Sequence, residues 1–170
     1  MMLRLRSYIA LLLLALPCVT LAQPDRVYKS LDDVRDLDQV YILRLRNKRL
    51  KAIPSQVYAM SNLRELDLRG NRIAHLSDSI ALLTNLQRLE LSRNPLALLP
   101  AAMASMANLR ELILWSTRVY ALPPEFSKLD ETLRLIDLRN CPLSLDDQEV
   151  INQLLPTVKK DWYNACNCGD

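Results

Sequence analysis

A repeating register of apolar residues constrains this sequence more than any other feature. An apolar residue is followed by further apolar residues three, five and ten positions later, and the pattern occurs five times. The first four copies start 23 residues apart and the fifth starts 24 residues after the fourth. Such a register predicts structural units that stack on one another and share a continuous core. The copies are Val40, Leu43, Leu45, Leu50; Leu63, Leu66, Leu68, Ile73; Leu86, Leu89, Leu91, Leu96; Leu109, Leu112, Leu114, Val119; and Leu133, Ile136, Leu138, Leu143.

Each copy is expected to contain a short strand, because alternate side chains of a strand point to opposite faces. Leu66 and Leu68 would therefore point into the core, and Asp67 would point out. In three copies a proline stands four positions after the tenth-position residue and marks a turn away from the strand. These prolines are Pro54, Pro100 and Pro123. The apolar residues after that turn recur every third position, as in Val57 and Met60, which predicts a short helical turn on the far side.

The segments LRELDLRGNRI at 63–73 and LQRLELSRNPL at 86–96 resemble the leucine-rich repeat family, in the 23-residue form of small secreted bacterial proteins. The resemblance covers residues 40–155. It implies an α/β solenoid: a right-handed superhelix with a curved parallel sheet, about five repeats and helical caps. Proteins of this family bind partners on the concave face of the sheet, so the resemblance implies a binding module without a catalytic domain.

The eighth position after each leading apolar residue is expected to hold a structural ladder. Leucine-rich repeats usually have Asn there, or sometimes Cys or Thr, because the buried turn contains backbone groups that water cannot reach. Lys48 departs from this pattern, so the first coil is expected to be irregular or open at that end. The ladder residues are Asn71, Asn94, Thr117 and Cys141.

The repeats divide the chain into four parts. Residues 1–22 are expected to be a signal peptide, 23–39 an N-terminal cap, 40–143 the leucine-rich repeats and 144–170 a C-terminal cap. Residues 27–34, with Ser30 as a helix cap, are predicted to form a capping helix. Residues 145–155 are predicted to form an amphipathic helix that ends before Pro156.

The N-terminus has the pattern of an export signal. Two arginines precede a ten-residue, almost wholly apolar run at 7–16, which Pro17 ends before the run is long enough to span a bilayer. Thr20 and Ala22 are small residues suited to cleavage after Ala22. We expect a secreted or periplasmic protein, and a lipid anchor at Cys18 or another cell-surface attachment is the alternative.

Composition excludes several classes of function. The chain has only two glycines, 99 positions apart, so it cannot form a glycine-rich phosphate loop, and one histidine cannot provide a multi-histidine metal site. No cofactor is expected. Without residues 1–22 the chain has 20 Lys and Arg against 19 Asp and Glu, or +1. This balance predicts neither a nucleic-acid partner nor a polybasic membrane patch.

The predicted concave face offers ten candidate partner-binding residues in two rows. In the fourth copy Trp115 interrupts the charges, and a large aromatic side chain on an exposed sheet suits a partner anchor. The alternative is that Trp115 stacks on Arg139 or Arg93 without any ligand. Similarly, the charges in the rows are expected mainly to pair with each other. The rows are Arg44, Asp67, Glu90, Ile113, Asp137 and Arg46, Arg69, Ser92, Trp115, Arg139.

Three cysteines would remain after export, so one is free, reactive or intermolecular. Cys166 and Cys168 are expected to form a tight disulfide with each other, or one of them a disulfide with Cys141 that pins the C-terminal cap. His75 follows a predicted turn with no nucleophile placed beside it, and a solvated surface role is expected.

The sequence thus predicts an exported, non-catalytic binding module, expected to be monomeric, whose partner is a protein or peptide, or alternatively a glycan. Two other hypotheses remain. The protein could be a passive structural component of the cell envelope, with a chemically inert sheet face. It could also be a thiol redox protein that uses Cys166 and Cys168.

Overall fold

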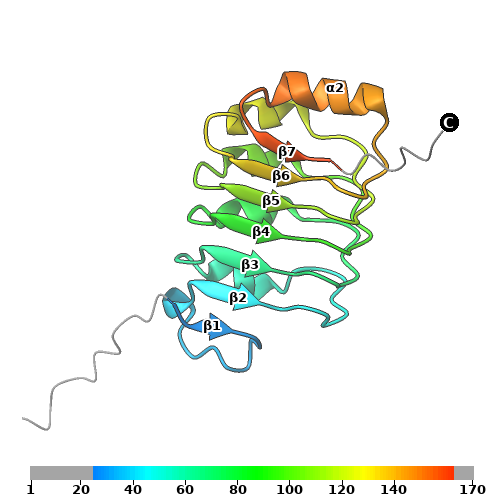
Figure 1. The fold of residues 1–170 in the computed structure, drawn as a ribbon. Helices are drawn as coiled ribbons and strands as arrows, with labels where there is room; N and C mark the ends of the chain where they lie inside the picture. The colour runs from blue at the N-terminus through cyan, green and yellow to red at the C-terminus, as the bar shows by residue number, and fades with distance from the viewer. Residues whose placement is uncertain (1–24, 163–170) are drawn as a thin grey trace, which may run out of the picture.

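The computed structural model describes residues 25–162 and has a seven-stranded parallel sheet as its main element. The strands follow each other in sequence order, so each coil lies beside the coil before it (Figure 1). The register repeats the sequence spacing, since Leu43 pairs with Leu66 and Leu66 with Leu89. The strands are β1 (Val27–Tyr28), β2 (Ile42–Arg44), β3 (Glu65–Asp67), β4 (Arg88–Glu90), β5 (Glu111–Ile113), β6 (Leu135–Asp137) and β7 (Lys159–Asp161).

Short 3-10 helices connect the strands and lie behind the sheet (Figure 1). Prolines precede three of them with extended backbone, which confirms the predicted turns at Pro54, Pro100 and Pro123. The i to i+3 bonding of a 3-10 helix suits the three-residue apolar spacing of these segments. The helices are η1 (Leu37–Gln39), η2 (Ser55–Ala59), η3 (Asp78–Leu82), η4 (Ala101–Ser105) and η5 (Pro124–Leu129).

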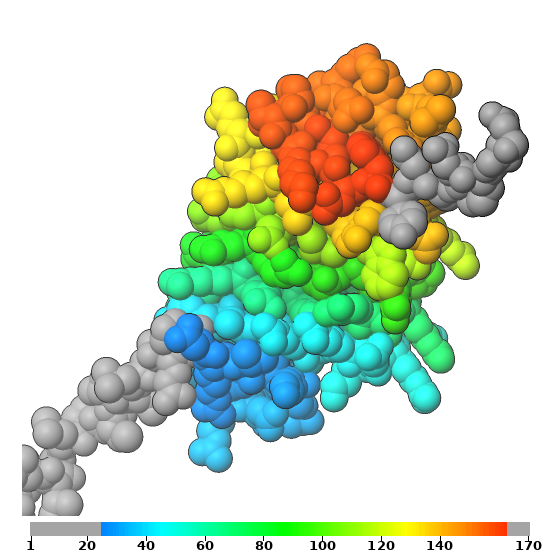
Figure 2. Space-filling view, viewed as in Figure 1, coloured from blue at the N-terminus to red at the C-terminus, as the bar shows by residue number. Residues whose placement is uncertain are grey.

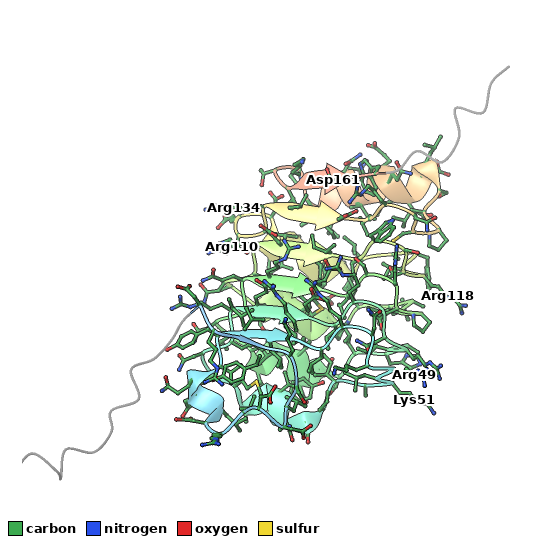
Figure 3. The ribbon with its side chains drawn as sticks, turned by 60° about the horizontal axis from the view of Figure 1, so that its bottom comes forward. Arg49, Lys51, Arg110, Arg118, Arg134 and Asp161 are labelled. Atoms are coloured by element: carbon green, nitrogen blue, oxygen red, sulfur yellow. The ribbon has the colours of Figure 1, made fainter. Side chains whose placement is uncertain are left out.

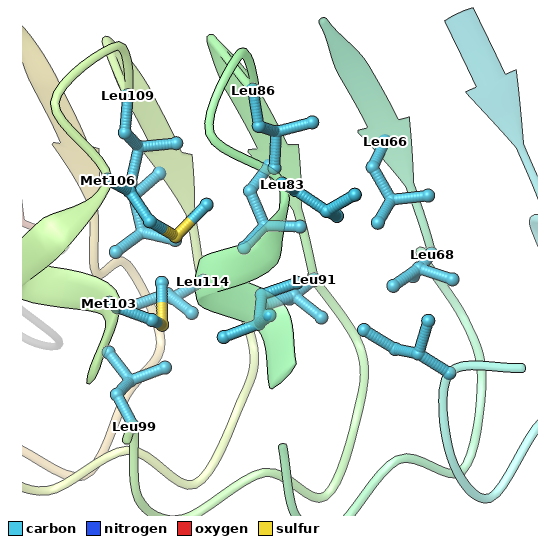
Figure 4. Packing of buried hydrophobic residues seen from close by; sticks show 14 of the residues in the cluster. Leu66, Leu68, Leu83, Leu86, Leu91, Leu99, Met103, Met106, Leu109 and Leu114 are labelled. Atoms are coloured by element: carbon cyan, nitrogen blue, oxygen red, sulfur yellow. The ribbon is translucent and has the colours of Figure 1, made fainter. Parts of the chain in front are cut away.

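The core lies between the sheet and the 3-10 helices. The apolar residues of the register are almost all fully buried, and those of successive coils stack in rows. Met103 of η4 and the following Met106 lie near Leu109 and Leu114, which flank β5 (Figure 4). Each coil buries its leucines only against neighbouring coils, so stability depends on the stack and not on any one repeat.

The prediction of a capping helix at residues 27–34 is wrong. Val27 and Tyr28 form β1, which pairs with β2, and Ser30 caps only a local turn through a bond from the amide of Asp32. Val27 and Tyr28 are strand formers, and pairing with β2 satisfies its otherwise open edge. The sheet therefore has seven strands where five repeats were predicted, because each cap contributes one.

The first coil is irregular, as its Lys48 suggests. Most turns contain one residue with positive φ, such as Gly70 at 71° or Arg93 at 55°. The first turn contains two, Asn47 at 55° and Arg49 at 58°. The coil is not open, however, because β1 covers its strand.

The predicted C-terminal helix is present as α2 (Leu145–Leu154), which lies at the end of the stack (Figure 1). Ser144 accepts a bond from the amide of Asp147, and the Asp147 carboxylate accepts one from the Ser144 amide, which forms a capping box. Ile151 and Leu155 are buried against the last coil. Two of the predicted apolar positions face solvent instead, since Leu145 and Val150 are 78% and 63% exposed.

Candidate functional site

The face of the sheet turned away from the 3-10 helices, called the open sheet face below, contains the ten predicted partner-binding residues. One row of five ends the strands β2 to β6, and the other row follows two positions later. Five of the ten are buried, and five retain exposed surface. The buried residues are Asp67, Glu90, Ser92, Ile113 and Asp137; the others are Arg44, Arg46, Arg69, Trp115 and Arg139.

The buried carboxylates accept hydrogen bonds from backbone amides. Asp67 accepts a bond from the amide of Arg69 at 3.1 Å, and Asp137 accepts one from the amide of Arg139 at 3.1 Å. Glu90 accepts the amide of Ser92 at 3.0 Å. Each carboxylate therefore closes the same local turn in its coil, and neighbouring side chains cover it. All three acids are only 2–4% exposed, and their carboxylates bond within the coil.

The arginines of the second row cover the carboxylates of Asp67 and Asp137, and their own side chains stay partly exposed to solvent. Arg46 and Arg69 both contact the Asp67 carboxylate, and Arg139 contacts the Asp137 carboxylate at 2.6 Å. The hydrogen bond that Arg46 donates to the Asp67 carboxylate raises the pKa of Arg46 above its ordinary value. The side chains of Arg46 and Arg139 remain 43% exposed while their partners are nearly buried. The exposed atoms of these ion pairs therefore belong mainly to the arginine side chains.

Trp115 belongs to the second row, where it lies between Ser92 and Arg139. The guanidinium carbon of Arg93 is 4.4 Å from the centre of the Trp115 ring, a cation–π contact. This is one of the two stacking partners predicted as the alternative to ligand binding. Ile113 is 7% exposed, and Trp115 is half-buried. The result is a partly desolvated aromatic platform next to guanidinium groups.

A further set of ion pairs involves Glu65, Arg88 and Glu111, the first residues of β3, β4 and β5. Arg44 contacts Glu65 at 3.0 Å, and Arg88 contacts both Glu111 and Glu90. Sequence inspection missed Glu65, Arg88 and Glu111, although their opposite charges alternate at the 23-residue spacing. The Arg44–Glu65 and Arg88–Glu111 pairs link adjacent coils across the sheet face.

The ladder residues make the bonds expected for their position. The Asn71 amide nitrogen donates to the carbonyls of Leu45 and Leu68, and its oxygen accepts the amides of Lys48 and Leu50. One side chain thus satisfies groups in two coils. Asn94 repeats this arrangement one coil later, with bonds to Leu68, Leu91, Ser92 and Ile73.

The ladder weakens toward the C-terminus. The Cys141 thiol donates to the Leu114 carbonyl at 3.2 Å and lies 3.3 Å from the Thr117 hydroxyl. Burial raises the pKa of the Cys141 thiol, which disfavours the thiolate needed for redox or nucleophilic chemistry. Cys141 is a free thiol in the described part of the chain. The predicted disulfide partners Cys166 and Cys168, like residues 1–24, lie outside the described residues.

A second asparagine ladder was not predicted. Asn62, Asn85 and Asn108 each donate to a backbone carbonyl of the preceding coil, at 2.8–2.9 Å. These side chains precede the leading leucines at 23-residue spacing, so the signal was present in the sequence. They lie at the start of the strands, at the edge opposite the first ladder.

The described residues show no other candidate centre. His75 is exposed on the turn after β3. Between residues 25 and 162 there is no group of three or more His, Cys, Asp or Glu side chains that could hold a metal ion. No helix in the same range is long and apolar enough to cross a membrane.

Comparison with known proteins agrees with this architecture. A family model described as leucine rich repeat matches residues 38–96. A solved leucine-rich repeat protein of Leptospira interrogans is similar in fold, with a TM-score of 0.54 and 24% identity; the match covers 80% of this chain and 46% of that one. The chain thus spans less than half the length of that protein. No curated protein matches the chain. Residues 38–96 thus match the leucine-rich repeat family, and the chain has the leucine-rich repeat fold.

Proposed function

We propose that this protein is an exported, non-catalytic binding module that holds a protein or peptide partner on its open sheet face. Leucine-rich repeat domains are typically protein-interaction modules and generally lack catalytic activity, since stacked repeats create an extended surface without a catalytic cleft. The observation that carries the proposal is the position of Trp115, a partly exposed aromatic side chain on the open sheet face beside Arg93.

The types of side chain on the open sheet face are suited to anchoring a partner. Aromatic and arginine side chains dominate the energy of many interfaces, because they combine a large contact area with directional bonds. Trp115, Arg93 and Arg69 provide both kinds of group on adjacent coils. Since Asp67 and Asp137 are committed to the frame, acidic groups of the partner would pair with the outer sides of Arg46, Arg69 and Arg139.

Affinity capture tests this proposal. The wild-type protein, Trp115→Ala and the control Leu82→Ala are immobilised and exposed to cell-envelope and culture-medium fractions. Leu82 is an apolar side chain that is 63% exposed on η3, behind the sheet. A partner retained by the wild type and Leu82→Ala but lost by Trp115→Ala supports the proposal. Identical captures by all three proteins contradict it and favour a passive structural role.

A further inference from the structure

Charge is segregated in the turns that follow strands β2 to β6. We call these segments the exit edge: residues 46–52, 69–75, 92–98, 115–121 and 139–145. They contain nine Lys or Arg and no Asp or Glu. The near-neutral balance of the chain arises because the acids lie elsewhere, on the sheet face, in the N-terminal region and in α2. The expectation that the chain has no polybasic patch, drawn from net charge, therefore does not apply to this edge.

Five exit-edge cations are exposed and form no ion pair with any carboxylate in residues 25–162. Their side chains extend from the turns into solvent, whereas Arg46, Arg69 and Arg139 are turned to the sheet acids. A cluster of like charges without counter-charges costs free energy unless an anion is nearby. The five are Lys48, Arg49, Lys51, Arg72 and Arg118.

The stack aligns these cations along one flank. Arg49, Arg72 and Arg118 occupy the same register position, and the amides of Arg72 and Arg118 bond to the preceding coils at 2.8 and 2.9 Å. Arg49, Lys51 and Arg118 point outward from one flank, while Arg110 and Arg134 lie at the opposite flank (Figure 3). In the space-filling view, side chains of the cyan and green coils project from the same flank (Figure 2).

Exposed apolar side chains accompany the cations. Tyr120 is 49% exposed and occupies the register position of Lys51. Leu98 is 53% exposed in the turn of the coil before it. A tyrosine and a leucine that project beside cations match the amphipathic composition of surfaces that lie at the boundary of headgroups and acyl chains.

We propose that the exit edge docks onto the surface of an anionic lipid bilayer. Lys and Arg near such a surface contribute additively through attraction to lipid phosphates, and the tyrosine and leucine gain from partial burial among the headgroups. A row of outward-pointing side chains along a straight flank meets a flat surface at several points at once. A soluble polyanion would use the cations but would leave Leu98 without a role. The five unpaired cations, Leu98 and Tyr120 are not among the ten residues of the open sheet face, so each proposal can fail without the other.

The first test compares charge-matched variants of the full chain in vesicle sedimentation. Arg49, Arg72 and Arg118 are changed together to Gln; the control changes Arg35, Lys128 and Arg134 to Gln, three exposed cations away from the exit edge. Vesicles contain phosphatidylcholine alone or with phosphatidylglycerol. We expect phosphatidylglycerol to increase vesicle binding of the wild type and of the control. At low salt, the increase for the exit-edge variant should be about 100-fold smaller. An equal loss in both variants overturns the proposal.

The second test locates the contact by hydrogen–deuterium exchange, which reports each segment separately from the apolar N-terminal run. With phosphatidylglycerol vesicles we expect slower exchange in residues 47–53 and 116–122 and no change in residues 128–134. The same slowing in Leu98→Ser/Tyr120→Ser should be weaker. Unchanged exchange at both exit-edge segments overturns the proposal. Slowing by soluble heparin but not by vesicles also overturns it and assigns the edge to a polyanion.

Discussion

The side-chain amide of Asn94 joins two coils: its nitrogen donates to the Leu68 carbonyl of the preceding coil at 3.1 Å and to the Leu91 carbonyl of its own coil at 2.9 Å. The Asn94 oxygen accepts the Ile73 amide at 3.0 Å. These groups lie inside the stack, away from water, so no solvent bond can replace the side chain. Asn94 therefore stabilises the junction between repeats in addition to its own turn.

Asn94→Ala should lower the free energy of unfolding by about 2–4 kcal/mol, because several buried backbone groups lose their partner. Urea denaturation followed by circular dichroism measures this change. Asn85→Ala is the control, since Asn85 is exposed and makes one bond to the Ser61 carbonyl. Its expected loss is less than about 1 kcal/mol. Equal losses in the two variants would contradict the role assigned to the buried ladder.

Leu89→Ala should destabilise the protein by about 2–5 kcal/mol, because it leaves a cavity in the middle of the stacked core. Leu89 is fully buried in β4, between Leu66 and Leu112. Leu82→Ala, at an exposed site, should change stability by less than about 0.5 kcal/mol. Thermal unfolding measures the stability of both variants. A loss of stability in Leu89→Ala as small as that in Leu82→Ala would show that the coils do not share one core.

Asp67→Ala should destabilise the protein more than Glu65→Ala. The Asp67 carboxylate is 3% exposed and bonds to the Arg69 amide and to two guanidinium groups. Its removal leaves the Arg69 amide and the facing cations without their partner, at an expected cost of about 2–3 kcal/mol. Glu65 is 23% exposed and forms one surface pair, worth about 0–1 kcal/mol. Chemical denaturation measures the free energy of unfolding of the two variants, and equal losses would contradict the structural role assigned to the buried Asp67 carboxylate.

The capping box of α2 predicts a pH effect. Hydrogen bonds from the side chain and the backbone of Ser144 lower the pKa of Asp147. Because the folded pKa lies below the unfolded value, this stabilisation is present above the unfolded pKa and is lost as the pH falls through the folded one. We expect Ser144→Ala to reduce the loss of stability on acidification. Melting temperatures measured from neutral to strongly acidic pH test this, and parallel curves for the two proteins would refute it.

The 23-residue register was sufficient to predict the stacked coils, the strands β2 to β6 and the ladder at Asn71 and Asn94. It could not predict β1, because Val27 and Tyr28 form a two-residue strand with no periodicity of its own. The burial of Asp67 and Asp137 was also beyond sequence inspection. An outward position on a single strand suggests exposure. In the structure, Arg46 of the preceding coil and Arg69 of the same coil cover the Asp67 carboxylate, and Arg139 of the same coil covers that of Asp137.

The arrangement of side chains on the open sheet face was predicted only in part. Trp115 was identified because a large aromatic side chain is unusual on an exposed sheet position, and the structure shows the Arg93 contact that holds its ring. The unpaired cations of the exit edge were missed, since net charge averages over acids that lie on other surfaces. Arg49 and Arg118 are 69 residues apart in sequence, and only the coil register places them on one flank.

The most direct measurement of the central claim is the binding of the captured partner to four proteins: wild type, Trp115→Ala, Arg93→Ala and the double variant. We expect Trp115→Ala to raise Kd at least tenfold, which corresponds to about 1.4 kcal/mol, with unchanged unfolding free energy. Because Arg93 acts through the Trp115 ring, the double variant should bind no worse than Trp115→Ala alone. An unchanged Kd for Trp115→Ala would contradict the assignment of the binding site to the open sheet face around this residue.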